Sequence, residues 1–137
     1  MKVNGGCHCG KISYEAEIDP EKVAVCHCTD CQAGSGSGYR TNVPAMKDTF
    51  KLVSGEPKIY VKTTADSGNP RAQGFCGDCG SPLFSTTVTD RHVYVLRVGS
   101  IRQRSELKPR SQGWYRSAQA WTQDIGALPK FEKQRPA

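Results

Sequence analysis

Long apolar runs are missing from this 137-residue sequence. No stretch approaches the roughly 18 consecutive apolar residues that a membrane-spanning helix needs. The opening MKVNGGCHCG has one Lys and lacks the apolar core of a secretory signal. Apolar residues make up only 36% of the chain, whereas Gly and Pro number 14 and 8. We therefore expect no membrane partner, a cytoplasmic location and a fold rich in loops and turns.

Helical periodicity is also scarce, whereas strand patterns recur. In the segment 11–18, apolar Ile12, Tyr14, Ala16 and Ile18 alternate with polar residues, which predicts a half-buried strand. A turn at 55–57 separates two of the further strands, and the last two strands should pair, with the more apolar 92–100 at the centre of a sheet. Short helical turns are expected at 29–32 and 45–48. The further strands are expected at 23–28, 49–55, 58–64, 82–88 and 92–100.

The predicted architecture is mainly β with little helix, in a single domain spanning 1–137, because no linker divides the chain. Its charge is uneven. Residues 1–90 hold nine Lys and Arg against ten Asp and Glu, and residues 91–137 hold ten against three. This basic C-terminal third suggests an anion-binding surface.

The seven cysteines carry the strongest chemical signal. In a reducing compartment they indicate metal ligands before disulfides, and an odd number leaves one thiol without a disulfide partner. If all seven bind two zinc ions as thiolates, the formal charge of +6 falls to +3, which makes nucleic acid an unlikely partner. The cysteines form three groups: Cys7 and Cys9; Cys26, Cys28 and Cys31; Cys76 and Cys79.

The simplest division joins the two pairs into one site and leaves the triplet alone. Gly77 and Gly80 accompany Cys76 and Cys79 in a zinc-knuckle pattern, and glycines also surround the first pair. A site with four thiolates is closed, so we expect Cys7, Cys9, Cys76 and Cys79 to hold a structural zinc rather than a catalytic one.

Cys26, Cys28 and Cys31 then form a three-ligand site, which is typical of a catalytic zinc with one exchangeable position. The alternative is that a histidine closes it, and His92 is the candidate. His8 and His27 each lie between two cysteines, so packing or support roles are expected for them. Residues 33–38, AGSGSG, form either a mobile loop beside the metal or an ordinary solvent loop. Tyr39 and Arg40 follow and lie either at the substrate or simply at the surface.

Four segments together resemble the glutathione-dependent formaldehyde-activating enzyme family, which also includes centromere protein V. They are GGCHCGKISYE, CHCTDCQAGSG, GFCGDCGSPLF and the closing LPKFEKQ, and they span Gly5 to about Pro136 with all seven cysteines at family spacing. The resemblance implies a β-tent, in which three small antiparallel sheets surround a structural zinc. It implies the same two ligand sets. It also implies the condensation of glutathione with formaldehyde to S-hydroxymethylglutathione, a carbon–sulfur lyase reaction.

The sequence departs from the family pattern at two places. Gln112 stands near a position where the family often has His, with Trp121 near the usual Trp. Gln32 and Ala33 replace a basic pair that is common after the third cysteine. If the missing His helps to position substrate, the prototype reaction is in doubt in this chain.

The expected chemistry is the joining or splitting of a thiol and an aldehyde at an open zinc site. Arginines should recognise the carboxylates of a glutathione-like thiol, and Arg40, Arg71 and Arg97 are the candidates. One alternative is a non-catalytic zinc module that binds nucleic acid or protein, with Trp114, Tyr115 and Trp121 stacking on bases, although such aromatic residues more often pack. Another is a plain zinc scaffold. The oligomeric state, monomer or homodimer, stays open.

Overall fold

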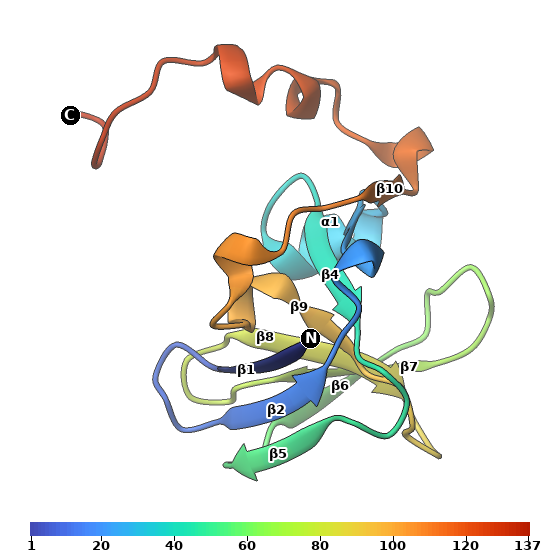
Figure 1. Cartoon of the computed structure of the whole chain (residues 1–137). Coiled ribbons are helices and arrows are strands. Elements are labelled where there is room, and N and C mark those ends of the chain that lie inside the picture. The colour runs from blue at the N-terminus through green and yellow to red at the C-terminus, as the bar shows by residue number, and fades with distance from the viewer.

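The structure is a computed structural model that describes residues 1–137, and it consists of two β-sheets with a C-terminal segment that extends away from them (Figure 1). The smaller sheet is antiparallel, with its strands in the order β1-β2-β5: β1 (Lys2–Gly6), β2 (Ser13–Glu17) and β5 (Lys51–Ser54). The larger sheet has seven strands. In spatial order they are β10 (Ser111–Gly113), β3 (Ala24–Cys26), β4 (Arg40–Pro44), β9 (Val95–Arg97), β8 (Pro82–Thr87), β7 (Arg71–Phe75) and β6 (Lys58–Lys62).

One α-helix, α1 (Thr29–Ser35), lies between β3 and β4. The predicted architecture, mainly β with little helix, is therefore confirmed. Two details differ from the family expectation: the strands join into two sheets rather than three, and β10 runs parallel to β3. The remaining helical elements are 3₁₀ turns: η1 (Pro20–Lys22), η2 (Val98–Ser100), η3 (Arg104–Glu106), η4 (Tyr115–Ser117), η5 (Ala120–Gln123) and η6 (Ile125–Ala127).

Each predicted strand segment contains an observed strand, and β8 pairs with β9 as expected. β9 is short, but it occupies the central position of the larger sheet, between β4 and β8. The turn at 55–57 is present, with Gly55 at φ 74°, yet the strands on either side diverge, because β5 joins β2 and β6 joins β7. The helical turn predicted at 45–48 is wrong, since the chain makes only a tight turn there with Asp48 at φ 61°.

Both sheets contribute to one hydrophobic core. Fifteen buried residues form it, among them Tyr14 of β2 and Phe84 and Leu96 of the larger sheet. Aromatic rings join the two layers, and the Phe50 ring stacks on Tyr94 with centroids 4.1 Å apart. Burial of such side chains is the main term that stabilises a fold of this size. The loops that carry the cysteines leave directly from strands anchored in this core.

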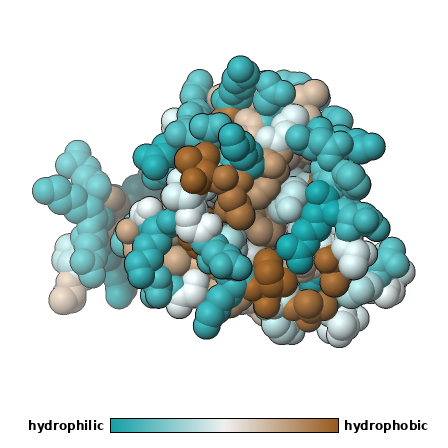
Figure 2. Space-filling view, turned by 90° about the horizontal axis from the view of Figure 1, so that it is seen from below, coloured by the Kyte–Doolittle hydropathy of each residue, from teal (hydrophilic) through white to brown (hydrophobic).

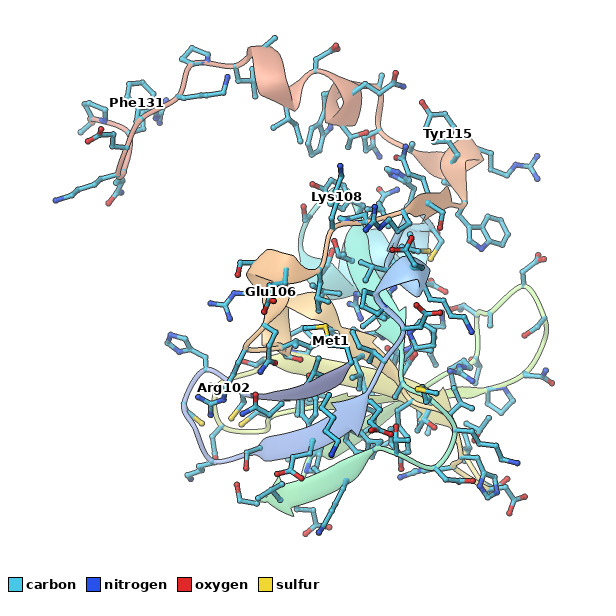
Figure 3. All side chains as sticks on the ribbon, viewed as in Figure 1. Met1, Arg102, Glu106, Lys108, Tyr115 and Phe131 are labelled. Atoms are coloured by element: carbon cyan, nitrogen blue, oxygen red, sulfur yellow. The ribbon has the colours of Figure 1, made fainter.

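The C-terminal segment from residue 114 onward runs along the top of Figure 1, apart from both sheets. Figure 3 shows Phe131 on this segment, well away from the core, and its side chain is 52% exposed. At the opposite end, β5 and β6 carry exposed Leu52, Val53 and Ile59, and the view from below shows apolar side chains interspersed with polar ones (Figure 2). No helix of the fold has the length and apolar character that crossing a membrane demands.

Candidate metal centres and the cleft beside them

The first cysteine cluster is formed where two hairpin loops meet. Cys7 and Cys9 lie in the loop between β1 and β2, and Cys76 and Cys79 lie in the loop between β7 and β8. Their four sulfur atoms are all within 4.8 Å of one another, and the Sγ atoms of Cys9 and Cys76 are 3.7 Å apart. Cys76 is also part of the hydrophobic core, with 1% of its surface exposed. The four-thiol cluster thus connects the two sheets at their ends.

The loop geometry shifts the thiols of this cluster in opposite directions. The pKa of Cys79 is lowered, whereas that of Cys9 is raised to about 11, because the lowering effect of the Lys11 amide is outweighed by the hydrogen bond with Cys7 and by burial. The Ile12 amide donates to Cys7 Sγ at 3.2 Å. Hydrogen bonding from the Ser81 hydroxyl, 3.2 Å from Cys79 Sγ, lowers the pKa of Cys79 to about 5. Gly80 adopts φ 76°, as a zinc-knuckle turn requires, but Gly77 does not have a positive φ. Four converging soft donors fit a tetrahedral zinc site.

The second cluster lies at the junction of β3 and α1. Cys26 ends β3, Cys28 is the N-cap of α1, and Cys31 lies in the first helical turn. Their sulfur atoms lie within 4.8 Å of one another, and the Cys31 amide donates to Cys28 Sγ at 3.3 Å. The hydrogen bond from the Cys31 thiol lowers the pKa of Cys26 to about 5, while the pKa of Cys31 is raised because it keeps the shared proton. The three-thiol cluster therefore already holds negative charge for a metal at neutral pH.

No histidine belongs to either cluster. His92, the residue expected to close the second site in the alternative interpretation, instead bonds through Nδ1 to Asp48 Oδ1 at 2.6 Å. The protein therefore offers three ligands at this site. The residues after it also differ from expectation, since 33–35 extend α1 rather than forming a loop, and the helix ends at Gly36 with φ 66°.

His27 has the supporting position expected of it. The side chain is 1% exposed, and its Nε2 donates to Gln112 Oε1 at 2.8 Å. Gln32 Nε2 donates to the carbonyl oxygens of His27 and Ser117, at 2.7 and 3.0 Å. The two glutamines that replace family residues thus hold the cysteine loop and join it to the C-terminal segment. No sequence pattern signals these long-range contacts.

A cleft of about 790 Å³ opens beside the three-thiol cluster. We call it the metal cleft. All three arginines named from the sequence, Arg40, Arg71 and Arg97, line it together with Cys26, Cys28 and Cys31. The arginines come from β4, β7 and β9, so only the folded sheet brings them together. None of the four cysteines of the first cluster lines this cleft. Lining residues that the sequence did not point to include Asn42, Tyr60, Lys62 and Gln73; Trp114, noted in the sequence only as a possible base-stacking residue, also lines it.

The metal cleft has an excess of positive charge. Besides the three-thiol cluster, Asp30 is its one acidic residue, and it bonds to Lys62 Nζ at 3.1 Å and accepts from the Thr64 hydroxyl at 2.8 Å. Arg97 is 7% exposed, and its guanidinium donates only to the neutral amides of Asn42 and Gln73. Burial, reinforced by the nearby charge of Arg40, lowers the pKa of Arg97 to about 9. Such a setting favours an anionic ligand.

The aromatic residues of the C-terminal segment pack only in part. Trp114, Tyr115 and Trp121 are each about half exposed. The Tyr115 and His27 rings form a T-shaped pair with their centroids 5.8 Å apart, and the Trp121 ring lies against Gly38. The expectation that these residues pack is therefore only partly met.

Comparison with known proteins agrees with the cysteine pattern. The family model described as glutathione-dependent formaldehyde-activating enzyme matches residues 2–117. An uncharacterized lyase of Schizosaccharomyces pombe is 27% identical over 92 residues, which cover 67% of this chain and 63% of that protein. The chain thus spans less than two thirds of this relative. A Rhodobacter sphaeroides protein of known crystal structure shares the fold, with a TM-score of 0.59, 18% identity and coverage of 80% of this chain and 98% of that one. Since the family match extends from β1 into η4 and includes both cysteine clusters, the chain belongs to the glutathione-dependent formaldehyde-activating enzyme family.

Proposed function

We propose that the protein is a zinc-dependent carbon–sulfur lyase that acts on the adduct of a glutathione-like thiol and an aldehyde. The observation that carries the proposal is that the three-thiol cluster and three arginines line one cleft. The family membership and the relative named as a lyase support the same class of reaction. We further propose that the whole chain acts as one domain, which the core shared by both sheets supports.

Two zinc ions per chain fit the donor sets. Cys7, Cys9, Cys76 and Cys79 would hold a structural ion, because four thiols leave no open position. Cys26, Cys28 and Cys31 would hold the second ion and leave one position for substrate. Bound there, zinc supplies Lewis acidity and stabilises a thiolate at neutral pH.

The reaction balances without any further reagent. In the joining direction a bond forms between the thiol sulfur and the aldehyde carbon, the C=O π bond breaks, and the thiol proton ends on the aldehyde oxygen. The reverse direction breaks the carbon–sulfur bond and returns that proton to sulfur. The task of the chain is therefore mainly to place a sulfur atom and a carbonyl group side by side.

Arginine side chains of the metal cleft perform the placement. Arg71 is partly exposed, and it is free to bind a carboxylate of the thiol in a bidentate manner. Tyr60 and Trp114 provide apolar surface on the same cleft for the uncharged part of the substrate. An anionic thiol is therefore preferred to a neutral one.

A second candidate function is a non-catalytic zinc module that binds nucleic acid or protein. One observation favours it, namely the half-exposed aromatic residues of the C-terminal segment. This alternative needs no exchangeable ligand position at Cys26, Cys28 and Cys31. The two functions are therefore distinguished by substitution of the three-thiol cluster. Loss of a thiol–aldehyde activity on that substitution supports the lyase and not the binding module.

The test is an exchange measurement on the zinc-loaded chain. ¹³C-formaldehyde is mixed with glutathione, cysteine or 2-mercaptoethanol, and the interconversion of free and adducted carbon is followed by NMR. We expect acceleration over the uncatalysed rate with glutathione and much less with the neutral 2-mercaptoethanol. Cys31→Ala should abolish the acceleration, whereas the distant charge change Arg135→Gln should leave it intact. No acceleration with any thiol overturns the proposal.

A further inference from the structure

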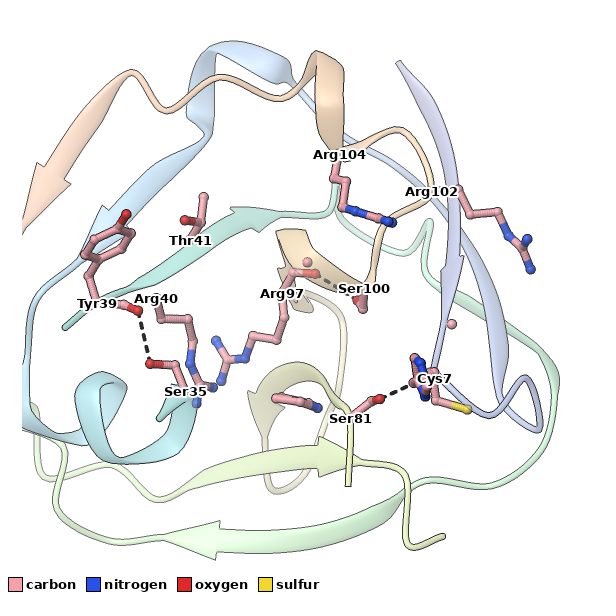
Figure 4. A pocket seen from close by; sticks show the side chains of 14 residues that line it. Cys7, Ser35, Tyr39, Arg40, Thr41, Ser81, Arg97, Ser100, Arg102 and Arg104 are labelled. Atoms are coloured by element: carbon pink, nitrogen blue, oxygen red, sulfur yellow. Dashed lines mark hydrogen bonds between the residues drawn. The ribbon is translucent and has the colours of Figure 1, made fainter. Parts of the chain in front are cut away.

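A second cleft, of about 640 Å³, lies on the other side of the arginine pair Arg40 and Arg97 (Figure 4). Arg40, Pro82 and Arg97 line both clefts and form the wall between them. The remaining walls of the second cleft come from α1, the segment η2–η3 and the loops after β1 and β7. Neither the three-thiol cluster nor Arg71 lines it, so it is a separate site.

The second cleft is strongly cationic. Arg102 and Arg104 line it in addition to the arginine pair, and no Asp or Glu does. None of these four arginines takes part in a salt bridge, since the ion pairs of the fold involve other residues. In Figure 4 the side chains of Arg40 and Arg97 extend toward one another, and Arg104 projects from the opposite wall. The three-thiol cluster faces Arg40 and Arg97 from the metal cleft, whereas Arg102 and Arg104 line the second cleft alone, so this cleft keeps a surface that attracts anions.

Arg40 is the most telling of these residues. Its side chain is 9% exposed, and its Nε is buried without a hydrogen-bond partner. The Nε of Arg97 is unpartnered in the same way. A buried guanidinium that lacks a carboxylate or phosphate is costly, because burial removes water without replacing it. The three-thiol cluster offsets part of this cost from the metal cleft, which both arginines also line, whereas Cys7 is the one cysteine that lines the second cleft.

The rest of the lining is polar and suits oxygen-rich ligands. Hydroxyl groups come from Ser35, Thr41, Ser81 and Ser100. The Ser35 hydroxyl donates to the Tyr39 carbonyl at 3.0 Å and that of Ser100 donates to the Arg97 carbonyl at 2.8 Å, so both protons are committed to the chain. The Thr41 hydroxyl makes no such bond and can donate to a ligand oxygen. Tyr39 and Pro82 are among the few apolar residues of the lining. Such a lining discriminates against a ligand with a large apolar part.

We propose that the second cleft binds a small polar dianion, a dicarboxylate or a phosphate monoester, with the arginine pair at its inner wall and Arg104 at its rim. Guanidinium groups match the planar geometry of carboxylate and the tetrahedral oxygens of phosphate through paired hydrogen bonds. This site goes beyond the thiol–aldehyde reaction, because it requires neither metal cluster to react.

Calorimetric titration of the zinc-loaded full chain tests the proposal. Succinate and inorganic phosphate serve as probes, at a constant ionic strength of about 0.1 M so that general screening does not change. The zinc content is measured before and after each titration, because both probes also bind zinc. Three variants are compared: Arg104→Gln in the second cleft, Arg71→Gln in the metal cleft alone, and Lys133→Gln on the distant C-terminal segment.

We expect at least one probe to bind with unit stoichiometry and unchanged zinc content. Arg104→Gln should weaken this binding about tenfold, the value of one charge-assisted contact, whereas the other two variants should stay within about twofold. The proposal is overturned if neither probe binds at concentrations up to about 10 mM, because a Kd above that value is too weak for a specific site. An equal loss of affinity in Arg71→Gln places the anion in the metal cleft. An equal loss of affinity in Lys133→Gln shows that the binding is general charge attraction. Either result also refutes the proposal.

Discussion

Removal of single cysteines from the two clusters should have sharply different consequences. Cys76 is buried in the hydrophobic core, and Cys7 and Cys79 pack against it, whereas no cysteine of the three-thiol cluster belongs to that core. We therefore expect Cys79→Ala to unfold the protein. Cys31→Ala should leave it folded with one zinc ion instead of two.

The magnitudes decide this expectation. A structural zinc contributes about 10–16 kcal/mol to the folding of a small domain, while the whole stability of such a domain is about 5–15 kcal/mol. If the loss of one of four ligands removes half of the zinc contribution, it costs about 5–8 kcal/mol, which equals the whole stability at the lower end of that range. Cys31→Ala affects only the start of the seven-residue helix α1. A cost of about 1–3 kcal/mol is expected there, with a decrease in Tm of about 3–12 °C.

The assay measures zinc per chain by mass spectrometry after desalting and thermal unfolding by circular dichroism. Cys9→Ala is the matched control, because Cys9 is exposed whereas Cys79 packs against the hydrophobic core. If metal ligation matters, Cys9→Ala is as damaging as Cys79→Ala; if only packing matters, it is mild. The reasoning fails if Cys31→Ala unfolds the protein as fully as Cys79→Ala, or if Cys79→Ala keeps the Tm of the wild type.

Three further substitutions test the cleft and its supports. Arg71→Gln should raise KM for a glutathione adduct about tenfold and leave kcat within about twofold, because it removes a binding contact rather than a group that reacts. A large decrease in kcat in steady-state kinetics would contradict this role. Gln112→Ala leaves the buried Nε2 of His27 without its acceptor, so urea unfolding should show a loss of about 1–3 kcal/mol. Gly74→Ala places a methyl group against the Phe84 ring and should cost about 1–3 kcal/mol, and an unchanged Tm would contradict this packing.

Strand β2 was found from the sequence because its outward and inward residues differ in polarity, whereas the other predicted strands were found from their apolar and β-branched content. In β2 the buried Tyr14 and Ala16 alternate with more exposed polar neighbours, and the pattern can be read directly. Four strands were not predicted, namely β1, β4, β7 and β10. Of these, β7 also alternates in burial, but its inward residues are Ala72 and Gly74. Small residues lie there because the Phe84 ring of the adjacent strand fills the space. Because the inward residues are small rather than strongly apolar, the sequence of this strand shows no alternation of apolar and polar residues.

The candidate metal clusters illustrate a different limit. Cysteine spacing was enough to group seven residues into the same two sets that the fold brings together, because so few divisions give whole sites. The spacing did not rank the arginines, since Arg40, Arg71 and Arg97 share a cleft only through the pairing of β4 with β9 and of β7 with β8. Nor did it reveal the unpartnered guanidinium of Arg40, which depends on the absence of nearby carboxylates in three dimensions.

The two departures from the family pattern acquire a physical meaning in this fold. Gln112 and Gln32 both bond to His27, the residue between two cysteines of the three-thiol cluster, one through the imidazole and the other through the carbonyl oxygen. Neutral amides at these positions hold the loop in place but supply no charge to a substrate. Under the proposed function, recognition of an anionic thiol rests on the arginines of β4, β7 and β9, which are fixed by strand pairing. Because a rigid strand holds a guanidinium with little entropic cost on binding, this arrangement favours a narrow choice among thiols, set by the positions of their acidic groups.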